Sequence, residues 1–438
     1  MKMANMDDYF DVVIVGTGAA GLYCALNLPA RYRILLLTKQ KADESDSFLA
    51  QGGICMQHGE ADYRPFFDDT MRAGHYENNP ATVDLMIRSS NSIIRDLVRR
   101  GVRFARDDHG ALRFTREGAH SRPRILFHED ITGHEITQTL LNEVLRCENI
   151  ELREHTTLLD FFADGSRFAV RAGSNDTAAG RGIGEPRAIG AGAVVLACGG
   201  IGGLYKNSTN FPHITGDAIA MALRHGVACE HLDYIQIHPT TLYSHRKGRR
   251  FLISESVRGE GALLLDKNGN RFTNELQPRD VVSAAIRAQM EKDGTDHVWE
   301  DMRPIGEAAI REHFPNILER CEEEGYDPIH EPIPVVPAQH YFMGGITADL
   351  SSRTALPRLY ACGETCCNGV HGRNRLASNS LLESLVFAQR AADDILYGEP
   401  PVFTGDKPDL APYREQEPLF AAYRQEVLTA IERSKNHE

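Results

Sequence analysis

Polar side chains able to bind an acidic ligand concentrate in the second half of the chain. They occur in five short segments, residues 238–240 (HPT), 254–262 (SESVRGEGA), 278–280 (PRD), 337–345 (PAQHYFMGG) and 371–383 (HGRNRLASNSLLE). Arginine offers a carboxylate two parallel N–H bonds, and histidine can donate to a carboxylate oxygen. A single His is more often a core residue and a single Arg a surface cation. As a set beside Gly- and Pro-rich turns, they predict a site for a small acidic substrate.

Residues 11–21 (DVVIVGTGAAG) have the pattern of a phosphate-binding turn. Residues 12–15 form an apolar, β-branched run, typical of a strand buried on both faces of a parallel sheet. Gly16, Gly18 and Gly21 follow with the G-x-G-x-x-G spacing, which permits a tight turn, a close approach to a pyrophosphate and close helix packing. A helix over residues 22–28 would aim its free N–H groups at the phosphates. An ordinary glycine-rich loop is the less favoured interpretation, because a strand and a helix flank the motif.

The second strand of this unit, residues 34–37, is followed by Thr38 and Lys39 rather than by an acid. In dinucleotide-binding folds that acid holds a ribose hydroxyl. Its absence counts against a standard NAD site and leaves FAD as a candidate.

The chain has 438 residues and a formal net charge of −13. The length predicts two domains plus a tail. The acidic balance disfavours nucleic acid and anionic membranes as partners. We expect no membrane span, because no window approaches the roughly eighteen apolar residues required, and no signal peptide. Nine scattered cysteines suit a cytoplasmic protein.

Cys362, Cys366 and Cys367 lie close together in the sequence. A metal site is one interpretation, but no second Cys/His pair has zinc-like spacing. We therefore expect small buried or half-buried cysteines and no metal site.

Periodicity and turn residues predict the remaining elements. Amphipathic helices are expected over residues 80–100 and 137–145, with a charged helix over 412–435 that is either exposed or docked. Short strands are expected within 150–172, followed by an exposed loop over 173–192. Buried strands are expected within 193–200 and 359–364. On composition alone, residues 115–124 (TREGAHSRPR) would be a solvated loop.

The chain resembles the succinate dehydrogenase/fumarate reductase flavoprotein family over residues 10–400. The motifs that carry the resemblance occur in the family's order: GTGAAG, AQGG, VVLACGG, TGDAIAMA, HPT, RGEGA, PRD, HYFMGGI, GE and RLASNSLLE. The resemblance implies an α/β fold with a Rossmann-like FAD-binding domain in two parts, residues 1–233 and 342–400. Residues 234–341 would be an inserted α+β capping domain, and residues 401–438 a short C-terminal helical tail.

The same resemblance assigns the cofactor contacts. FAD would be held by the turn residues Gly16, Thr17, Gly18, Ala19, Ala20 and Gly21, by Lys39, by Ser47, Ala50, Gln51, Gly52 and Gly53, by Asp217, by Glu364 at the ribose, and by Asn379, Ser380 and Leu381 near the flavin ring. Glu364 then offers the carboxylate that Thr38 lacks. Asp46 stands where membrane-complex relatives carry a flavin-linking His, so attachment is expected to be non-covalent.

The substrate contacts implied by the resemblance are Glu117, His238, Thr240, Arg258, Arg279, His340 and Arg375. Residues 116–121 (REGAHS) resemble the substrate loop of the member that acts on L-aspartate. Hydride transfer from its Cα to the flavin would give iminoaspartate, the first step of NAD biosynthesis through quinolinate. Oxygen or fumarate would reoxidise the flavin, with Arg279 as proton donor and Glu255 and Arg258 as a relay. Arginines of the loop are expected to keep Glu117 ionised.

Three questions stay open in the sequence. A fumarate reductase or succinate dehydrogenase flavoprotein subunit is the nearest alternative, opposed by Glu117 and by Asp46. A flavin-binding module without turnover is opposed by the intact His/Arg/Glu set. Handover of iminoaspartate to quinolinate synthase is left open. Relatives commonly continue into a further helical domain of about a hundred residues, where this chain has only residues 401–438.

Overall fold

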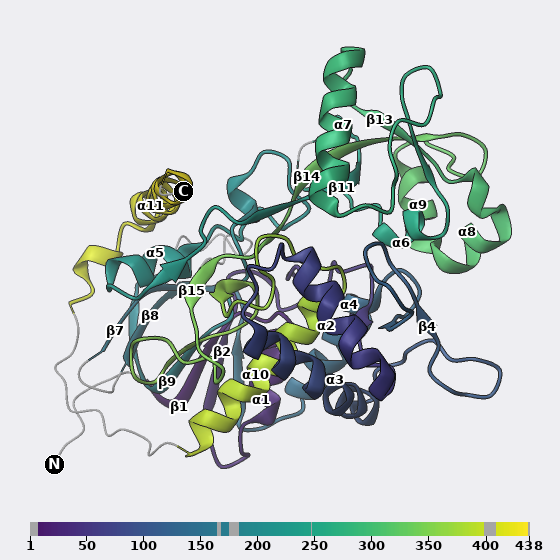
Figure 1. The fold of residues 1–438 in the computed structure, drawn as a ribbon. Helices are drawn as coiled ribbons and strands as arrows, with labels where there is room; N and C mark the ends of the chain where they lie inside the picture. Colours follow the sequence, from purple (N-terminus) through teal and green to yellow (C-terminus); the bar gives the residue numbers. More distant parts are fainter. Residues whose placement is uncertain (1–7, 164–167, 175–183, 247, 398–408, 437–438) are drawn as a thin grey trace, which may run out of the picture.

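The computed structural model describes residues 8–163, 168–174, 184–246, 248–397 and 409–436. Its centre is a seven-stranded sheet with the order β6-β2-β1-β9-β8-β7, in which β16 also pairs with β9 (Figure 1). Its strands are β1 (Asp8–Val15), β2 (Ile34–Leu37), β6 (Ile150–Arg153), β7 (Thr156–Ala163), β8 (Phe168–Ser174), β9 (Arg187–Leu196) and β16 (Leu359–Ala361). β1 runs parallel to both β2 and β9. The carboxyl ends of three strands therefore meet at one edge.

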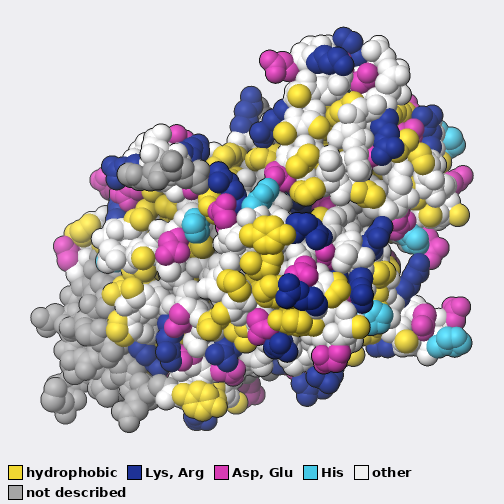
Figure 2. Space-filling model, viewed as in Figure 1, with side chains coloured by type: hydrophobic (Ala, Val, Ile, Leu, Met, Phe, Trp, Pro, Cys, Tyr) yellow, Lys and Arg dark blue, Asp and Glu magenta, His cyan; other side chains and the backbone are white. Residues whose placement is uncertain are grey.

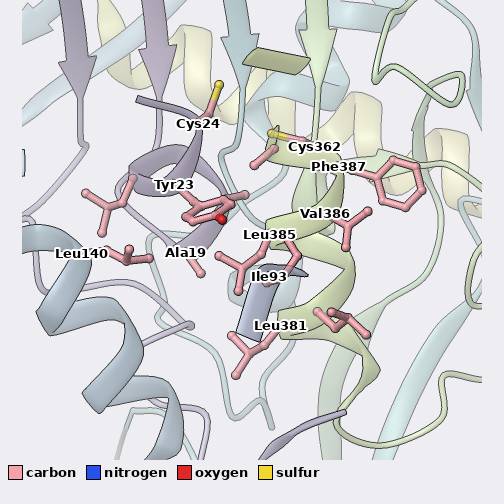
Figure 3. Packing of buried hydrophobic residues seen from close by; sticks show 14 of the residues in the cluster. Ala19, Tyr23, Cys24, Ile93, Leu140, Cys362, Leu381, Leu385, Val386 and Phe387 are labelled. Carbon is pink, nitrogen blue, oxygen red and sulfur yellow. The ribbon is translucent and has the colours of Figure 1, made fainter. Parts of the chain in front are cut away.

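The two faces of β1 contribute to two separate cores. Val12 and Ile14 pack into one core, and Val13 and Val15 into the other. Because side chains alternate along a strand, this confirms the double-sided burial that the apolar run predicts. Helices on the first side are α1 (Ala19–Asn27), α2 (Tyr63–Ala73), α3 (Pro80–Arg100), α4 (Thr132–Val144) and α10 (Asn379–Tyr397). Figure 3 shows Tyr23, Ile93, Leu140 and Leu385 converging there from four of these helices.

The opposite side of the sheet is covered by α5 (Asp217–Arg224) and α11 (Gln416–Lys435). Tyr423, Val427 and Ile431 of α11 are buried in this core. Arg224 of α5 pairs with Glu426 at 2.6 Å. The C-terminal helix is therefore docked, a point that the sequence left open.

A second sheet, drawn in green at the upper right of Figure 1, has the order β11-β14-β13-β12. Its strands are β11 (Ile235–Leu242), β12 (Leu263–Leu265), β13 (Val298–Asp301) and β14 (Ile333–Phe342), with helices α6 (Glu255–Gly259), α7 (Arg279–Asp293), α8 (Glu307–His313) and α9 (Pro315–Glu323). It has a core of its own that includes Val257, Ile286 and Ile317. This core separates the second sheet from the first as a packing unit.

Two small sheets join distant segments. One has the order β10-β15-β17, formed by β10 (Cys229–Glu230), β15 (Gly345–Thr347) and β17 (Cys366–Cys367). The other has the order β3-β5-β4, formed by β3 (Ile54–Cys55), β5 (Ile125–Leu126) and β4 (Phe114–Thr115). The β3-β5-β4 sheet fixes both ends of residues 115–124.

Most predicted elements are present, with two differences. The strand Ile34–Leu37 and the helix Pro80–Arg100 have the expected bounds. The helix expected over 137–145 begins earlier, at Thr132. The exposed loop over 173–192 is wrong at both ends, because β8 continues to Ser174 and β9 already begins at Arg187. Residues 175–183 of that loop lie outside the described residues.

No helix within the described ranges is long and apolar enough to cross a bilayer. On the face shown in Figure 2, basic side chains are interspersed with acidic ones. All nine cysteines are free thiols, and Cys362, Cys366 and Cys367 are buried, as expected.

Candidate active site

A cavity of about 410 Å³ lies at the carboxyl ends of β1, β2 and β9. This is the edge at which open parallel sheets bind nucleotides. Gly16 has a φ of +116°, and a Cβ there would lie 2.0 Å from the Ala197 carbonyl oxygen. A Cβ on Gly21 would lie 1.9 Å from the Gly16 carbonyl oxygen. The turn therefore requires glycine where the spacing predicts it.

Buried polar atoms around this cavity fit a dinucleotide such as FAD. Five of them have no hydrogen-bond partner within the described residues: Thr17 Oγ1, Ser45 Oγ, Asp46 Oδ2, Gln51 Oε1 and Asn210 Oδ1. Leaving such atoms unpaired in a protein interior is costly. A ligand with several phosphate, ribose and ring acceptors and donors would satisfy them.

Charged groups of the cavity are also placed for a nucleotide. Lys39 Nζ donates to Asp217 Oδ2 at 2.6 Å and to Thr215 Oγ1 at 3.2 Å. Burial raises the pKa of Glu364 to about 8, and the neighbouring Asp46 adds to the effect. Burial also raises the pKa of Asp46 to about 7, against the Phe211 N–H and Arg249. Carboxyls with these pKa values can be neutral hydrogen-bond donors as well as acceptors.

Most residues expected to contact FAD line the cavity. They are Gly16, Thr17, Gly18, Ala20, Lys39, Ser47, Ala50, Gln51, Gly52, Gly53, Asp217, Glu364, Ser380 and Leu381. Ala19, Gly21 and Asn379 do not line it. Ala19 donates its N–H to Ser47 Oγ at 3.0 Å, and Asn379 Nδ2 donates to Thr70 Oγ1 at 3.1 Å. These three support the turn and the start of α10.

Two arginines meet on the wall of the cavity. Arg279 Nη1 donates to Gln236 Oε1 at 2.9 Å, and Arg375 Nε donates to the same oxygen at 3.2 Å. Burial and the charge of Arg279 lower the pKa of Arg375 to about 10. Two guanidinium groups sharing one neutral oxygen repel each other. An anion between them would relieve that repulsion, which is the chemistry that a carboxylate site requires.

Of the two predicted histidines, His340 lines the cavity and His238 lies behind it. The rings of His238 and His340 lie 5.1 Å apart at 74°. Burial and Arg279 lower both pKa values well below the usual range, so both rings are neutral. His340 Nδ1 is 2.8 Å from Thr209 Oγ1, and His238 Nε2 is buried with no hydrogen-bond partner among the described residues. Thr240 instead donates its hydroxyl to the Ile253 carbonyl at 3.2 Å, and it does not line the cavity.

Glu117 reaches the cavity from residues 115–124 and is 3% exposed. Its Oε2 accepts from Ser378 Oγ at 2.6 Å and its Oε1 from Ser256 Oγ at 3.1 Å. Burial and Glu255 raise the pKa of Glu117, while Ser378 and Arg279 oppose the rise. The expectation that arginines of the loop keep it ionised is therefore wrong: burial dominates, and the opposing cation is Arg279.

Glu255 connects the predicted relay residues. Its Oε2 accepts from Arg279 Nε at 2.6 Å and lies 3.8 Å from Arg258 Nη2. Burial alone would raise the pKa of Glu255, but Arg279 and Arg258 lower it. Arg258 does not line the cavity and donates from Nη1 to the Glu275 carbonyl at 2.6 Å. Arg279, Glu255 and Arg258 thus form a row of charged side chains that runs from the cavity into the core of the β11-β14-β13-β12 sheet.

Residues 115–124 are not the solvated loop that composition suggests. Arg124 is fully buried and donates to Asp62 at 2.9 Å and to Asp69 at 2.8 Å. His120 Nδ1 is 2.8 Å from Arg124 Nη1, and Ser121 N–H donates to Asp69 at 2.7 Å. This network anchors the segment that carries Glu117.

Sequence reasoning missed three residues that hold the site together. They are Gln236, Ser256 and Ser378, each of which bonds a predicted site residue. Gln236 lies two positions before His238, and Ser256 and Ser378 lie within the quoted SESVRGEGA and RLASNSLLE motifs. Their place in these segments was the available signal.

Comparisons with known proteins agree with this geometry. The FAD binding domain family model matches residues 11–381. The chain is 47% identical over 386 residues to L-aspartate oxidase of Clostridium perfringens, covering 88% of this chain and 86% of that protein. It is 43% identical over 451 residues to L-aspartate oxidase of Nostoc sp., covering 98% and 76%. A structure of quinol-fumarate reductase with menaquinol molecules is 31% identical with a TM-score of 0.83, covering 97% and 75%.

The sheet, the glycine turn and the cavity thus define a flavoprotein of the FAD-binding class that includes the fumarate reductase flavoproteins. Identity of 42–47% over most of the chain narrows this class further. The chain belongs to the L-aspartate oxidase family.

Proposed function

We propose that this protein oxidises L-aspartate to iminoaspartate with non-covalently bound FAD, as the first step of NAD biosynthesis through quinolinate. The observation that carries the proposal is the buried Glu117 carboxylate beside a cavity whose wall holds Arg279 and Arg375. L-Aspartate has two carboxylates and one ammonium. Around this part of the cavity Arg279 and Arg375 can bind the two carboxylates and Glu117 the ammonium, while Glu255 is already bonded to Arg279.

Charge complementarity also explains selection of the amino acid. The ammonium loses water when the substrate is enclosed, and an unpaired buried charge is very costly. An ionised Glu117 pairs with it, while the arginines bind the carboxylates in bidentate geometry. Neutral His238 and His340 can hydrogen-bond the substrate without adding a third cation. When bound, FAD supplies the hydride acceptor for the Cα–H bond.

We propose that residues 234–341 act as a cap that excludes water from the substrate, and that residues 409–436 belong to a tail docked on the FAD-binding part. The separate core of the second sheet supports a distinct cap. Free thiols throughout support a reducing, cytoplasmic location. Because a free imine hydrolyses in water, we also propose that iminoaspartate is handed directly to quinolinate synthase.

A second candidate is reduction of fumarate by the same site. The row Arg279–Glu255–Arg258 favours it, because one alkene carbon of fumarate takes the hydride and the neighbouring carbon must take a proton. Arginine is hard to deprotonate, so the proton-donor role of Arg279 is supported by its position between the cavity and Glu255. The two activities share one cavity, with fumarate reoxidising the flavin that aspartate has reduced.

An anaerobic flavin-bleaching titration separates the candidates. L-Aspartate should bleach the oxidised flavin at lower concentration than succinate, which lacks the ammonium. Equal bleaching by both would remove the role of Glu117. Bleaching by succinate alone would assign the chain to succinate or fumarate chemistry.

A further inference from the structure

Three metal-ligating side chains converge on the small sheet β10-β15-β17, outside the FAD cavity. They are Glu230 of β10, the adjacent His231, and Cys367 of β17. One carboxylate oxygen, one imidazole nitrogen and the Sγ atom all lie within 4.8 Å of one another. Among the described residues, this is the one set of three or more His, Cys, Asp or Glu side chains whose ligand atoms lie close enough together to hold a metal ion.

Strand register explains why residues so far apart in sequence meet. Glu230 pairs with Gly345, and Cys367 pairs with Thr347 two positions further along β15. Residues two apart on a strand share a face, so Glu230 and Cys367 lie on the same face of the sheet. Gly345 has no side chain to separate them. Cys366, paired with Ile346, faces the other way.

His231 is held in place by its surroundings. Its φ is +52°, a left-handed conformation uncommon for a residue with a Cβ. A Cβ on Gly344 would lie 2.0 Å from the His231 carbonyl oxygen, which shows how closely the two backbones approach. Its ring stacks on Tyr234 with centroids 4.4 Å apart. The imidazole therefore has a defined position beside Glu230 and Cys367.

Within the part of the chain that the structure describes, none of the three makes a side-chain hydrogen bond with another side chain. Cys367 is 6% exposed, whereas Glu230 and His231 are exposed. An ion at this cluster would thus have the Cys367 Sγ on its buried side and the Glu230 and His231 side chains toward solvent.

We propose that Glu230, His231 and Cys367 bind one Zn²⁺ or similar transition-metal ion, with water as the fourth ligand. A thiolate with an imidazole selects zinc-like metals over Mg²⁺ and Ca²⁺, which prefer oxygen ligands. Zinc bonds of about 2.0–2.3 Å place tetrahedral ligand atoms roughly 3.3–3.8 Å apart. Rotation of the exposed Glu230 side chain, with small shifts of the His231 ring against Tyr234, closes the remaining gap. The ion would tie β10 to β17, the strand that leads into residues 368–378 and hence to Arg375 and Ser378.

Cobalt titration of the chelator-treated holoprotein tests the site. Co²⁺ bound to a thiolate in a tetrahedral site gives d–d bands at longer wavelengths than flavin absorption. We expect one equivalent of Co²⁺ to give these bands and Zn²⁺ to remove them. Cys367→Ser should abolish the absorption that arises from charge transfer between the thiolate and Co²⁺. His231→Ala and Glu230→Gln should each raise the dissociation constant for Co²⁺ at least about tenfold. Cys147→Ser, at a half-buried thiol far from the sheet in sequence, is the matched control.

Thermal unfolding gives an independent measurement. Zn²⁺ should raise the unfolding temperature of the wild type and of Cys147→Ser, and should leave that of His231→Ala unchanged. His231 is exposed, so this variant tests the site even if Cys367→Ser folds poorly. No stoichiometric Co²⁺ binding, or binding that His231→Ala and Glu230→Gln leave unchanged, would overturn the proposal.

Discussion

Ser378 Oγ donates a 2.6 Å hydrogen bond to Glu117 Oε2, joining residues 261 positions apart in the chain. Ser378 Oγ also accepts a hydrogen bond from the Gly53 N–H at 3.1 Å. Ser378 has a φ of +62°, so its position depends on the surrounding structure. The Ser378 side chain thus links the loop that carries Glu117, Gly53 at the FAD cavity and the start of α10.

Glu117→Gln should separate the two activities of the site. Loss of the negative charge leaves the substrate ammonium unpaired, so kcat/KM for L-aspartate should fall by about 3 kcal/mol, a factor of about 100 to 200. Fumarate reduction should stay at the wild-type level or rise, because fumarate has no cation. Steady-state kinetics on both substrates check this. Parallel losses would mean that Glu117 only shapes the loop.

The pH dependence of kcat/KM for L-aspartate should report the ionisation of Glu117. Burial raises its pKa, and only the ionised form pairs with ammonium. Activity should therefore be lost as pH falls through a value above the usual Glu pKa of about 4.3. Ser378→Ala removes a hydrogen bond that lowers this pKa, so the acid limb should move to higher pH. In Glu117→Gln the limb should disappear; a limb that stays in place in both variants would assign it to another group.

Arg279→Leu should lower fumarate turnover by dithionite-reduced enzyme by far more than about tenfold, or 1.4 kcal/mol. Arg279 is the cation that touches both Glu255 and Gln236 beside the cavity. FAD content, measured by absorbance, should be unchanged. Arg287→Leu, an exposed position on the same helix, is the control. Turnover of Arg279→Leu within tenfold of wild type would end the proton-donor assignment.

The purified protein should be yellow and should release its FAD on acid or heat denaturation. Asp46 lines the cavity and accepts from the Phe211 N–H at 2.9 Å, and a carboxyl there provides no flavin-linking imidazole. Denaturing gel electrophoresis followed by flavin fluorescence measures release. Fluorescence that migrates with the polypeptide would show a covalent bond.

The sequence predicts what local patterns determine. The double-sided burial of β1 and the bounds of Pro80–Arg100 follow from periodicity, with Asn79 capping the helix and Gly101 ending it at a φ of +103°. The start of β9 at Arg187 could not be predicted, because Gly- and Ala-rich residues become a strand there by pairing with β1 and β8. The burial of Glu117, His120 and Arg124 within residues 115–124 was equally hidden.

That burial depends on charges from other elements. Arg124 is neutralised by Asp62 and Asp69, which lie 62 and 55 positions earlier. No local pattern in 115–124 distinguishes such an arginine from the exposed Arg122. The resemblance identified Glu117 because residues 116–121 match a substrate loop whose folded position is known in the family. Gln236 and Ser378 have side chains that are common at positions without a catalytic role, so their residue types alone did not identify them.

The Arg124 network gives a last prediction, on stability. Arg124→Met removes the only cation that the structure shows bonding both Asp62 and Asp69 within the described residues. Asp62 would then remain buried without its cation and Asp69 would keep only Arg72 and Ser121, so the free energy of unfolding should fall by about 3–5 kcal/mol. Urea unfolding of the holoprotein, followed by circular dichroism, measures the change.

Arg122→Met is the matched control, because Arg122 is exposed and, in the part of the chain that the structure describes, its guanidinium donates to the Ala61 carbonyl and to no carboxylate. Its effect on unfolding should stay within about 0.5 kcal/mol. Since Ser121 and His120 share the network with Arg124, Arg124→Met should also lower kcat/KM for L-aspartate more than it lowers fumarate turnover. Unchanged stability would mean that Asp62 and Asp69 tolerate solvent or protonation, and the loop would then owe its position to Ser378 and Ser256 alone.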